Sequence, residues 1–226
     1  GLENAQTKLL KSPFNYSENA YLYVPKDMPE SSNRLFNNHL VSHIYPLIIA
    51  SKGRAFILST SIKSMNEITS LLKDEFERNN ISYPILTQGT GSKTKLLEQF
   101  KSHGNAILIG SLSFWEGVDV RGSNLSLVII DKLPFQSPGD PIFESKINML
   151  SDKGINAFMT FQLPKAIIAL KQGAGRLIRD EMDKGVLMIC DQRIVSKPYG
   201  KRFWRSLPDF KRTREQDDVI EFLKHL

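Results

Sequence analysis

The chain has 226 residues, of which 41% are hydrophobic and 24% are charged, and its formal net charge is +6. This length suits one large domain or at most two small ones with a real core. No run of about 18 apolar residues is present, and the N-terminus lacks the basic-then-apolar pattern of a signal peptide, so neither a membrane span nor secretion is indicated and a cytoplasmic protein is expected.

The positive charge is concentrated near the C-terminus. Residues 197–214 contain seven basic residues and one acidic residue, a surplus equal to the net charge of the whole chain. Any affinity for a polyanion is therefore expected to be local. The single cysteine, Cys190, lies in an apolar run and can neither close a disulfide within the chain nor hold a metal alone, so we expect a reducing compartment and no metal site.

Short apolar runs rich in β-branched or aromatic residues alternate with longer segments of helical period. The predicted strands are 21–24, 55–60, 83–87, 105–110, 125–131 and 185–191. The predicted helices are 34–50, 62–79, 93–101, 141–152, 163–178 and 214–226. Strands without polar alternation are typical of a parallel sheet covered on both faces, and the helix-length connections indicate right-handed crossovers. The sequence thus predicts a three-layer α/β/α domain with a mostly parallel sheet.

This domain is expected to cover residues 21–206, after an irregular lead-in at 1–20 and before a basic tail with a short amphipathic helix at 207–226. In that last helix an apolar stripe is formed by Val219, Phe222, Leu223 and Leu226. The stripe either docks on the domain or binds a partner. The basic stretch also carries aromatic residues, namely Tyr199, Phe203, Trp204 and Phe210. They suit a nucleic-acid surface, or they anchor the stretch to the domain.

Ligands of open parallel sheets bind where the strands end at their carboxyl edge. The predicted strand 105–110 is followed by SLSFWEGVDVRG, which places Glu116 and Asp119 around Gly117. These carboxylates could accept hydrogen bonds from ribose hydroxyls or order water near a phosphate. The alternative is an ordinary turn between a strand and a helix.

The stretch QGAGRLIRD, residues 172–180, combines two glycines with two arginines. On a continuous helix Gln172, Arg176 and Arg179 would lie within about 60° of one another, opposite the apolar face of the helix. Gly173 and Gly175 each lower helix stability by up to about 1 kcal/mol relative to alanine, which favours a close backbone approach or an early helix end. The arginines either form surface ion pairs or bind an anion such as a triphosphate.

The order and spacing of these segments resemble the second RecA-like domain of superfamily 2 helicases, and more narrowly the DinG/YoaA branch of the XPD-like iron–sulfur DNA helicases. The stretches that carry the resemblance are AFILSTS (55–61) for motif IV, SFWEGVD (113–119) for motif V and QGAGRLIR (172–179) for motif VI, with LTQGTGSKTKLLEQF (86–100), IIDKLPF (129–135) and PGDP (138–141) beside them. Motifs V and VI together are highly specific, and the resemblance covers about residues 14 to 214.

The resemblance implies a role for each matching residue. Arg176 and Arg179 match the arginine fingers that stabilise charge on the γ-phosphate during ATP hydrolysis. The residues implied in nucleotide binding are Gln172, Gly175, Glu116, Gly117 and Asp119. Candidate contacts to single-stranded DNA are Ser59, Thr60, Ser61, Gln88, Gly89, Ser113 and Trp115. Hydroxyl groups and backbone N–H groups at loop ends suit contacts to phosphates that do not depend on base sequence.

The phosphate-binding half of such an enzyme is missing from this sequence. The segment GTGSKT (89–94) departs from the pattern G-x-x-x-x-G-K-[ST], and one cysteine cannot hold a four-cysteine cluster. The family implies ATP and Mg²⁺ shared with an N-terminal RecA-like domain of the same polypeptide, and a 4Fe–4S cluster elsewhere in that polypeptide. It also implies 5′→3′ polarity, a role in repair or replication restart and, through the last helix, contact with the χ subunit of the clamp loader.

Two other functions compete with an ATP-dependent helicase motor. A non-catalytic RecA-like module would use Arg176 and Arg179 only for nucleic acid or structure. A dinucleotide enzyme of the Rossmann type is disfavoured, because no G-x-G-x-x-G follows the first predicted strands.

Overall fold

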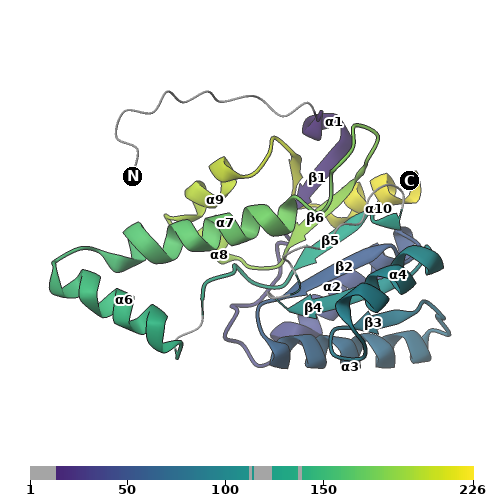
Figure 1. Ribbon diagram of the computed structural model, residues 1–226. Coiled ribbons are helices and arrows are strands. Elements are labelled where there is room, and N and C mark those ends of the chain that lie inside the picture. Colours follow the sequence, from purple (N-terminus) through teal and green to yellow (C-terminus); the bar gives the residue numbers. More distant parts are fainter. Residues whose placement is uncertain (1–13, 112–113, 115–123, 137–138) are drawn as a thin grey trace.

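The computed structural model describes residues 14–111, 114, 124–136 and 139–226, and Figure 1 shows a twisted sheet between layers of helices. The strands are β1 (Ala20–Tyr23), β2 (Ala55–Ser59), β3 (Ile85–Thr87), β4 (Ile107–Ser111), β5 (Leu127–Ile130), β6 (Gly185–Ile189) and β7 (Lys211–Thr213). They lie in the order β3-β4-β2-β5-β6-β1-β7, and every neighbouring pair is parallel.

The helices connect these strands. They are α1 (Tyr16–Asn19), α2 (Phe36–Ala50), α3 (Ile62–Arg78), α4 (Lys93–His103), α6 (Pro141–Asp152), α7 (Leu163–Ala174), α8 (Arg193–Ser196), α9 (Gly200–Ser206) and α10 (Gln216–Lys224). A π-helical turn, Phe158–Gln162, leads directly into α7.

Both faces of the sheet are covered, as the unbroken apolar runs predict. Every residue of β2, β4, β5 and β6 is buried. Successive residues of β2 enter opposite cores: Phe56 packs with residues of α4, α7 and α9, whereas Ile57 packs with residues of α2, α3 and α10. Side chains of a strand alternate between faces, so an apolar residue at every position requires a core on each side. The predicted three-layer α/β/α architecture is confirmed.

The C-terminal segment is built into the fold. Strand β7 pairs with β1 at the end of the sheet. The apolar stripe of α10 faces the core shared with α2, with Val219 and Leu223 fully buried and with Phe222 and Leu226 packed against the same core. The apolar stripe therefore docks on the domain. Strand β7 was not predicted from the sequence, because its residues, Lys-Arg-Thr, show no apolar pattern.

Within the part of the chain described above, no helix combines the length and the apolar character needed to cross a bilayer.

Candidate functional site

The carboxyl ends of the parallel strands share one edge of the sheet, and the residues proposed for motif IV lie there at the end of β2. Ser59 is fully buried, so its hydroxyl does not reach the surface. Thr60 is half-buried, and Ser61 is exposed. The Ser61 hydroxyl accepts a hydrogen bond from the Ser64 N–H at 3.1 Å and so caps helix α3. Of these three residues, Thr60 and Ser61 are accessible to a ligand.

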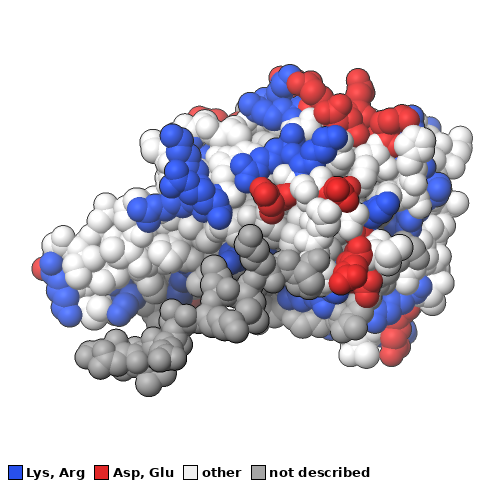
Figure 2. Space-filling view, turned by 90° about the horizontal axis from the view of Figure 1, so that it is seen from above, with Lys and Arg blue, Asp and Glu red and all other residues white. Residues whose placement is uncertain are grey.

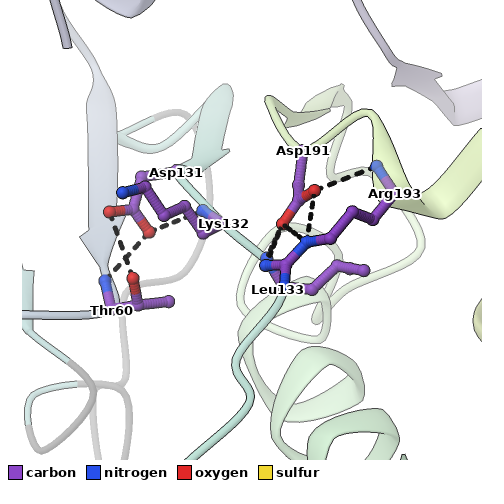
Figure 3. A network of polar contacts seen from close by, with 6 residues as sticks. All are labelled: Thr60, Asp131, Lys132, Leu133, Asp191 and Arg193. Carbon is purple, nitrogen blue, oxygen red and sulfur yellow. Dashed lines mark hydrogen bonds and ion pairs between the residues drawn. The ribbon is translucent and has the colours of Figure 1, made fainter. Parts of the chain in front are cut away.

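A buried carboxylate fixes this loop. Asp131, directly after β5, is fully buried and accepts hydrogen bonds from the backbone N–H of Thr60 at 2.9 Å and of Lys132 at 2.6 Å (Figure 3). The Ser64 hydroxyl donates to the same carboxylate at 2.9 Å. Burial raises the pKa of Asp131 to about 6, although these hydrogen bonds and the charge of Lys132 act in the opposite direction. Asp131 therefore holds the motif IV loop in place.

The raised pKa of Asp131 predicts a pH dependence of stability. The carboxyl group titrates near pH 3.8 when exposed and near pH 6 in the fold, so between these values only the folded chain holds the proton. This contribution is fully present below pH 3.8 and is lost as the pH rises through about 6, which amounts to roughly 3 kcal/mol. Urea unfolding of the native chain and of Asp131→Asn from pH 4 to 7 measures this contribution. The difference in the free energy of unfolding in favour of the native chain should decrease as the pH rises.

The exposed Asp74 provides the control for this experiment, because Asp74→Asn removes a carboxylate that is in contact with solvent. Its difference from the native chain should stay flat over the same range. An equally flat difference for Asp131→Asn would contradict the raised pKa.

A second buried carboxylate lies just beyond the end of the neighbouring strand. Asp191 follows β6, is 1% exposed, and accepts a hydrogen bond from the Leu133 N–H at 2.8 Å. The guanidinium group of Arg193 also donates to Asp191, from Nε at 2.9 Å and from Nη2 at 2.6 Å (Figure 3). Asp131 and Asp191 together hold both backbone N–H groups that flank the Lys132 side chain. Neither aspartate was a predicted site residue, although an aspartate just after a buried run is a visible signal.

Gln88 joins the ends of β3 and β4. Its Oε1 accepts hydrogen bonds from the Ser111 backbone N–H at 2.7 Å and from the Ser111 hydroxyl at 2.9 Å. Gly89 follows at φ +97° on the exposed turn, a conformation that favours glycine. The structure thus brings Gln88, Gly89, Thr60 and Ser61 to the same edge of the sheet.

The two arginines of motif VI do not lie on a helix, and the predicted helix 163–178 is too long. Helix α7 ends at Ala174. Beyond it the Arg176 N–H donates to the Gly173 carbonyl at 3.1 Å, and the Leu177 N–H donates to the Ala174 carbonyl at 3.2 Å. Each bond spans three residues, which is the tighter spacing of a 3₁₀ turn. The glycines on either side of Ala174 weaken the helix, which agrees with the early end that they suggested. Arg176 and Arg179 are both half-buried, and Gln172 is exposed on α7.

The arginine turn, residues 175–180, is fixed by a carboxylate and by close packing. Asp183, 6% exposed, accepts hydrogen bonds from the backbone N–H groups of Arg179 and Asp180, both at 2.9 Å. Leu177 is buried against the start of β6, where a methyl group on Gly185 would lie 2.6 Å from Leu177 Cδ1 and 2.5 Å from the Ser126 carbonyl oxygen. A glycine at 185 is what permits this approach.

This packing places the arginine turn at the amino end of β6, and therefore at the edge of the sheet opposite Thr60 and Gln88. The cause is topological, because α7 returns antiparallel to the strands and delivers its C-terminal residues to their start. The two groups of predicted residues consequently lie at opposite edges of the sheet. The remaining predicted residues, Ser113, Trp115, Glu116, Gly117 and Asp119, lie outside the described residues.

The sequence offers a single cysteine to an iron–sulfur cluster. Cys190 is the single cysteine of the sequence, it is fully buried, and burial raises the pKa of its thiol. Among the described residues, moreover, no three His, Cys, Asp or Glu side chains group together as metal ligands would. A four-cysteine cluster of the implied family does not fit this chain.

Known proteins resemble the chain over nearly its whole length. Residues 44–210 match the profile of the family described as "Helicase C-terminal domain". The ATP-dependent DNA helicase YoaA of Haemophilus influenzae is 47% identical over 225 residues, which cover 100% of this chain and 34% of that protein. YoaA of Escherichia coli is 48% identical over 223 residues, which cover 99% of this chain and 34% of that protein.

A solved structure of an XPD helicase has the same fold. It superimposes with a TM-score of 0.63 at 19% identity, over 86% of this chain and 35% of that one. The chain thus spans about a third of the length of the curated relatives it matches. These similarities confirm the resemblance to the DinG/YoaA-type and XPD-like helicases.

Proposed function

The chain belongs to the helicase C-terminal domain family, and from this premise we propose that it is the second motor domain of an ATP-dependent DNA helicase. In this proposal the complete polypeptide is of the DinG/YoaA type, moves 5′→3′ along single-stranded DNA, and acts in repair or replication restart. The observation that carries the proposal is the arginine turn, which holds the half-buried Arg176 and Arg179 in a chain whose sequence shows no phosphate-binding loop.

Guanidinium groups held in this way suit a nucleotide that is bound by another domain. In the proposed enzyme an N-terminal RecA-like domain binds ATP and Mg²⁺, and Arg176 and Arg179 complete the site across the cleft between the domains. Their charge stabilises the negative charge that develops on the transferring phosphoryl group. The hydrogen bonds that the backbone N–H groups of the turn donate to Asp183 support the fixed geometry that such stabilisation needs. Gln172 and Gly175, with Glu116, Gly117 and Asp119, are proposed to line the same site.

The opposite edge is proposed to contact the strand. Thr60 and Ser61 present a hydroxyl group and the first turn of helix α3, while Gln88 and Gly89 present an amide side chain and an exposed turn. Such groups bind phosphates without reading bases. Ser113 and Trp115 belong to the same proposed track. A strand on one edge and a nucleotide on the other would let a single domain couple hydrolysis to movement.

A 4Fe–4S cluster is proposed only for another part of the complete polypeptide, since the cysteine content of this chain excludes it here. Contact with the χ subunit of the clamp loader was expected through the last helix. Because the apolar stripe of α10 is packed in the core, we propose that any such contact uses the exposed side of the helix, where Asp217, Asp218 and Glu221 lie.

The isolated chain should lack the activity of the complete polypeptide. The 226 residues alone should show no DNA-stimulated ATP hydrolysis, because the phosphate-binding loop is supplied by another domain. The complete polypeptide should hydrolyse ATP and be stimulated by single-stranded DNA. Phosphate release with and without an oligonucleotide measures both, and robust turnover by the isolated chain would contradict the proposal.

A further inference from the structure

Exposed cations collect on one flank of the domain, over α9 and β7. This α9–β7 surface consists of Lys197, Lys201, Arg202, Arg205 and Arg212, all of them exposed. Figure 2 shows Lys and Arg side chains gathered on this face of the molecule. The surface accounts for most of the positive charge that the sequence concentrates in residues 197–214.

Within the described part of the protein, these cations form no close ion pair with a carboxylate. The ion pairs described there join Lys26 to Glu215, Arg78 to Glu75, Arg193 to Asp191 and His225 to Glu221. None of them involves a cation of the α9–β7 surface. Five neighbouring cations without carboxylate partners repel one another and attract a polyanion.

Aromatic residues beneath this surface connect it to the domain. Phe203 and Phe210 are buried in the core, and the indole N–H of Trp204 donates to the Ile194 carbonyl at 2.8 Å. The guanidinium group of Arg212 lies 5.0 Å from the centre of the Trp204 ring and donates to the Trp204 carbonyl at 3.3 Å. The aromatic rings therefore anchor α9 to β7 and are not laid out for stacking on bases. A ligand of this surface would be recognised by its phosphates.

The sheet order places the α9–β7 surface beyond the proposed strand contacts. Gln88 follows β3 at one end of the sheet, Thr60 follows β2 further along, and Arg212 lies in β7 at the other end. Helix α9 starts near the carboxyl edge, where Tyr199 packs against Phe135. A strand that followed this edge from β3 would arrive at the cations of α9.

We propose that the α9–β7 surface binds the sugar–phosphate backbone of single-stranded DNA, as a second contact beside the motif IV edge. The direction of the strand rests on the proposed function, whereas binding by the surface does not. Cations near β7 also have an alternative role, because lysine and arginine on an edge strand discourage pairing with other sheets. That role alone would leave DNA affinity unchanged when the cations of α9 are removed.

The test measures binding of the 226-residue chain to a fluorescent thirty-nucleotide oligothymidine over a range of salt concentrations, without ATP. The variant Lys201→Gln/Arg202→Gln/Arg205→Gln removes three cations of α9. The control Lys73→Gln/Lys101→Gln/Lys153→Gln removes three exposed cations elsewhere. Each phosphate contact contributes about 0.7 to the slope of log affinity against log salt on single strands. The α9 variant should bind at least roughly tenfold more weakly at low salt, with a slope smaller by about 2.

Equal affinity and slope for the α9 variant and the control would overturn the proposal, and thermal unfolding checks that both remain folded. A duplex of the same length, bound more tightly than the single strand and weakened by the same variant, would overturn the single-strand assignment. The result is independent of the proposed ATP turnover of the complete polypeptide, because the binding assay contains no ATP and leaves Arg176 and Arg179 intact.

Discussion

Replacement of Arg179 by alanine in the complete polypeptide is expected to lower DNA-stimulated ATP hydrolysis by about 10³- to 10⁵-fold, which is the range for an arginine finger in phosphoryl transfer. The reason is that, in the proposed enzyme, its guanidinium group stabilises charge that appears only in the transition state. Arg176→Ala should have an effect in the same range. Steady-state phosphate release at saturating single-stranded DNA measures both.

Lys171 provides a matched control for these variants, because it is an exposed cation on the last turns of α7, close to the arginine turn. Lys171→Ala should change turnover by no more than a few fold. Binding of single-stranded DNA without ATP should be unaffected in Arg176→Ala and Arg179→Ala. If turnover survived both substitutions while DNA binding fell, the arginines would serve nucleic acid, and the non-catalytic module would be the better description.

The second large effect is expected on stability. Asp191→Ala should lower the free energy of unfolding by about 2–3 kcal/mol, because it removes the acceptor of buried donors and breaks an ion pair in which Asp191 is buried while the Arg193 side chain is 32% exposed. The substitution leaves the Leu133 N–H without its acceptor and the guanidinium group of Arg193 without its carboxylate. Urea unfolding followed by circular dichroism measures the change.

An exposed ion pair supplies the contrast. Glu215 pairs with Lys26 at the surface, where both side chains are more than half exposed. Glu215→Ala should cost less than about 1 kcal/mol, because solvent screens the pair. A loss for Asp191→Ala as small as that for Glu215→Ala would mean that Asp191 does not hold the segment after β5.

The sequence by itself determined the layers of the fold and the identity of the motifs. Runs such as residues 105–110 and 125–131 contain apolar residues at successive positions, which is typical of strands that are buried on both faces of a sheet. The helix that carries Gln172 was also visible, because Leu163 and Leu170 recur at helical spacing and are both fully buried. These features are local, since they depend on residues that are neighbours in the chain.

Tertiary structure alone decided where polar residues find their partners. Asp131 accepts a hydrogen bond from Thr60, which lies 71 residues away in the sequence, and Asp191 accepts one from Leu133, which lies 58 residues away. No local sequence pattern therefore identifies either contact. The end of α7 was also decided in this way. Leu177 continues the apolar period, yet packing against Gly185 and the hydrogen bonds to Asp183 stabilise a turn in place of another helical turn.

The separation of the two proposed sites has the same origin. Motif spacing predicted Arg179 and Thr60 as candidate site residues, but only the antiparallel return of α7 places them at opposite edges of the sheet. Strand β7 likewise forms because β1 offers it a free edge, although its own residues are polar. The hydrophobic periodicity of a segment indicates which face of a helix or strand is buried, whereas the partner of a hydrogen-bonding group depends on the path of the whole chain.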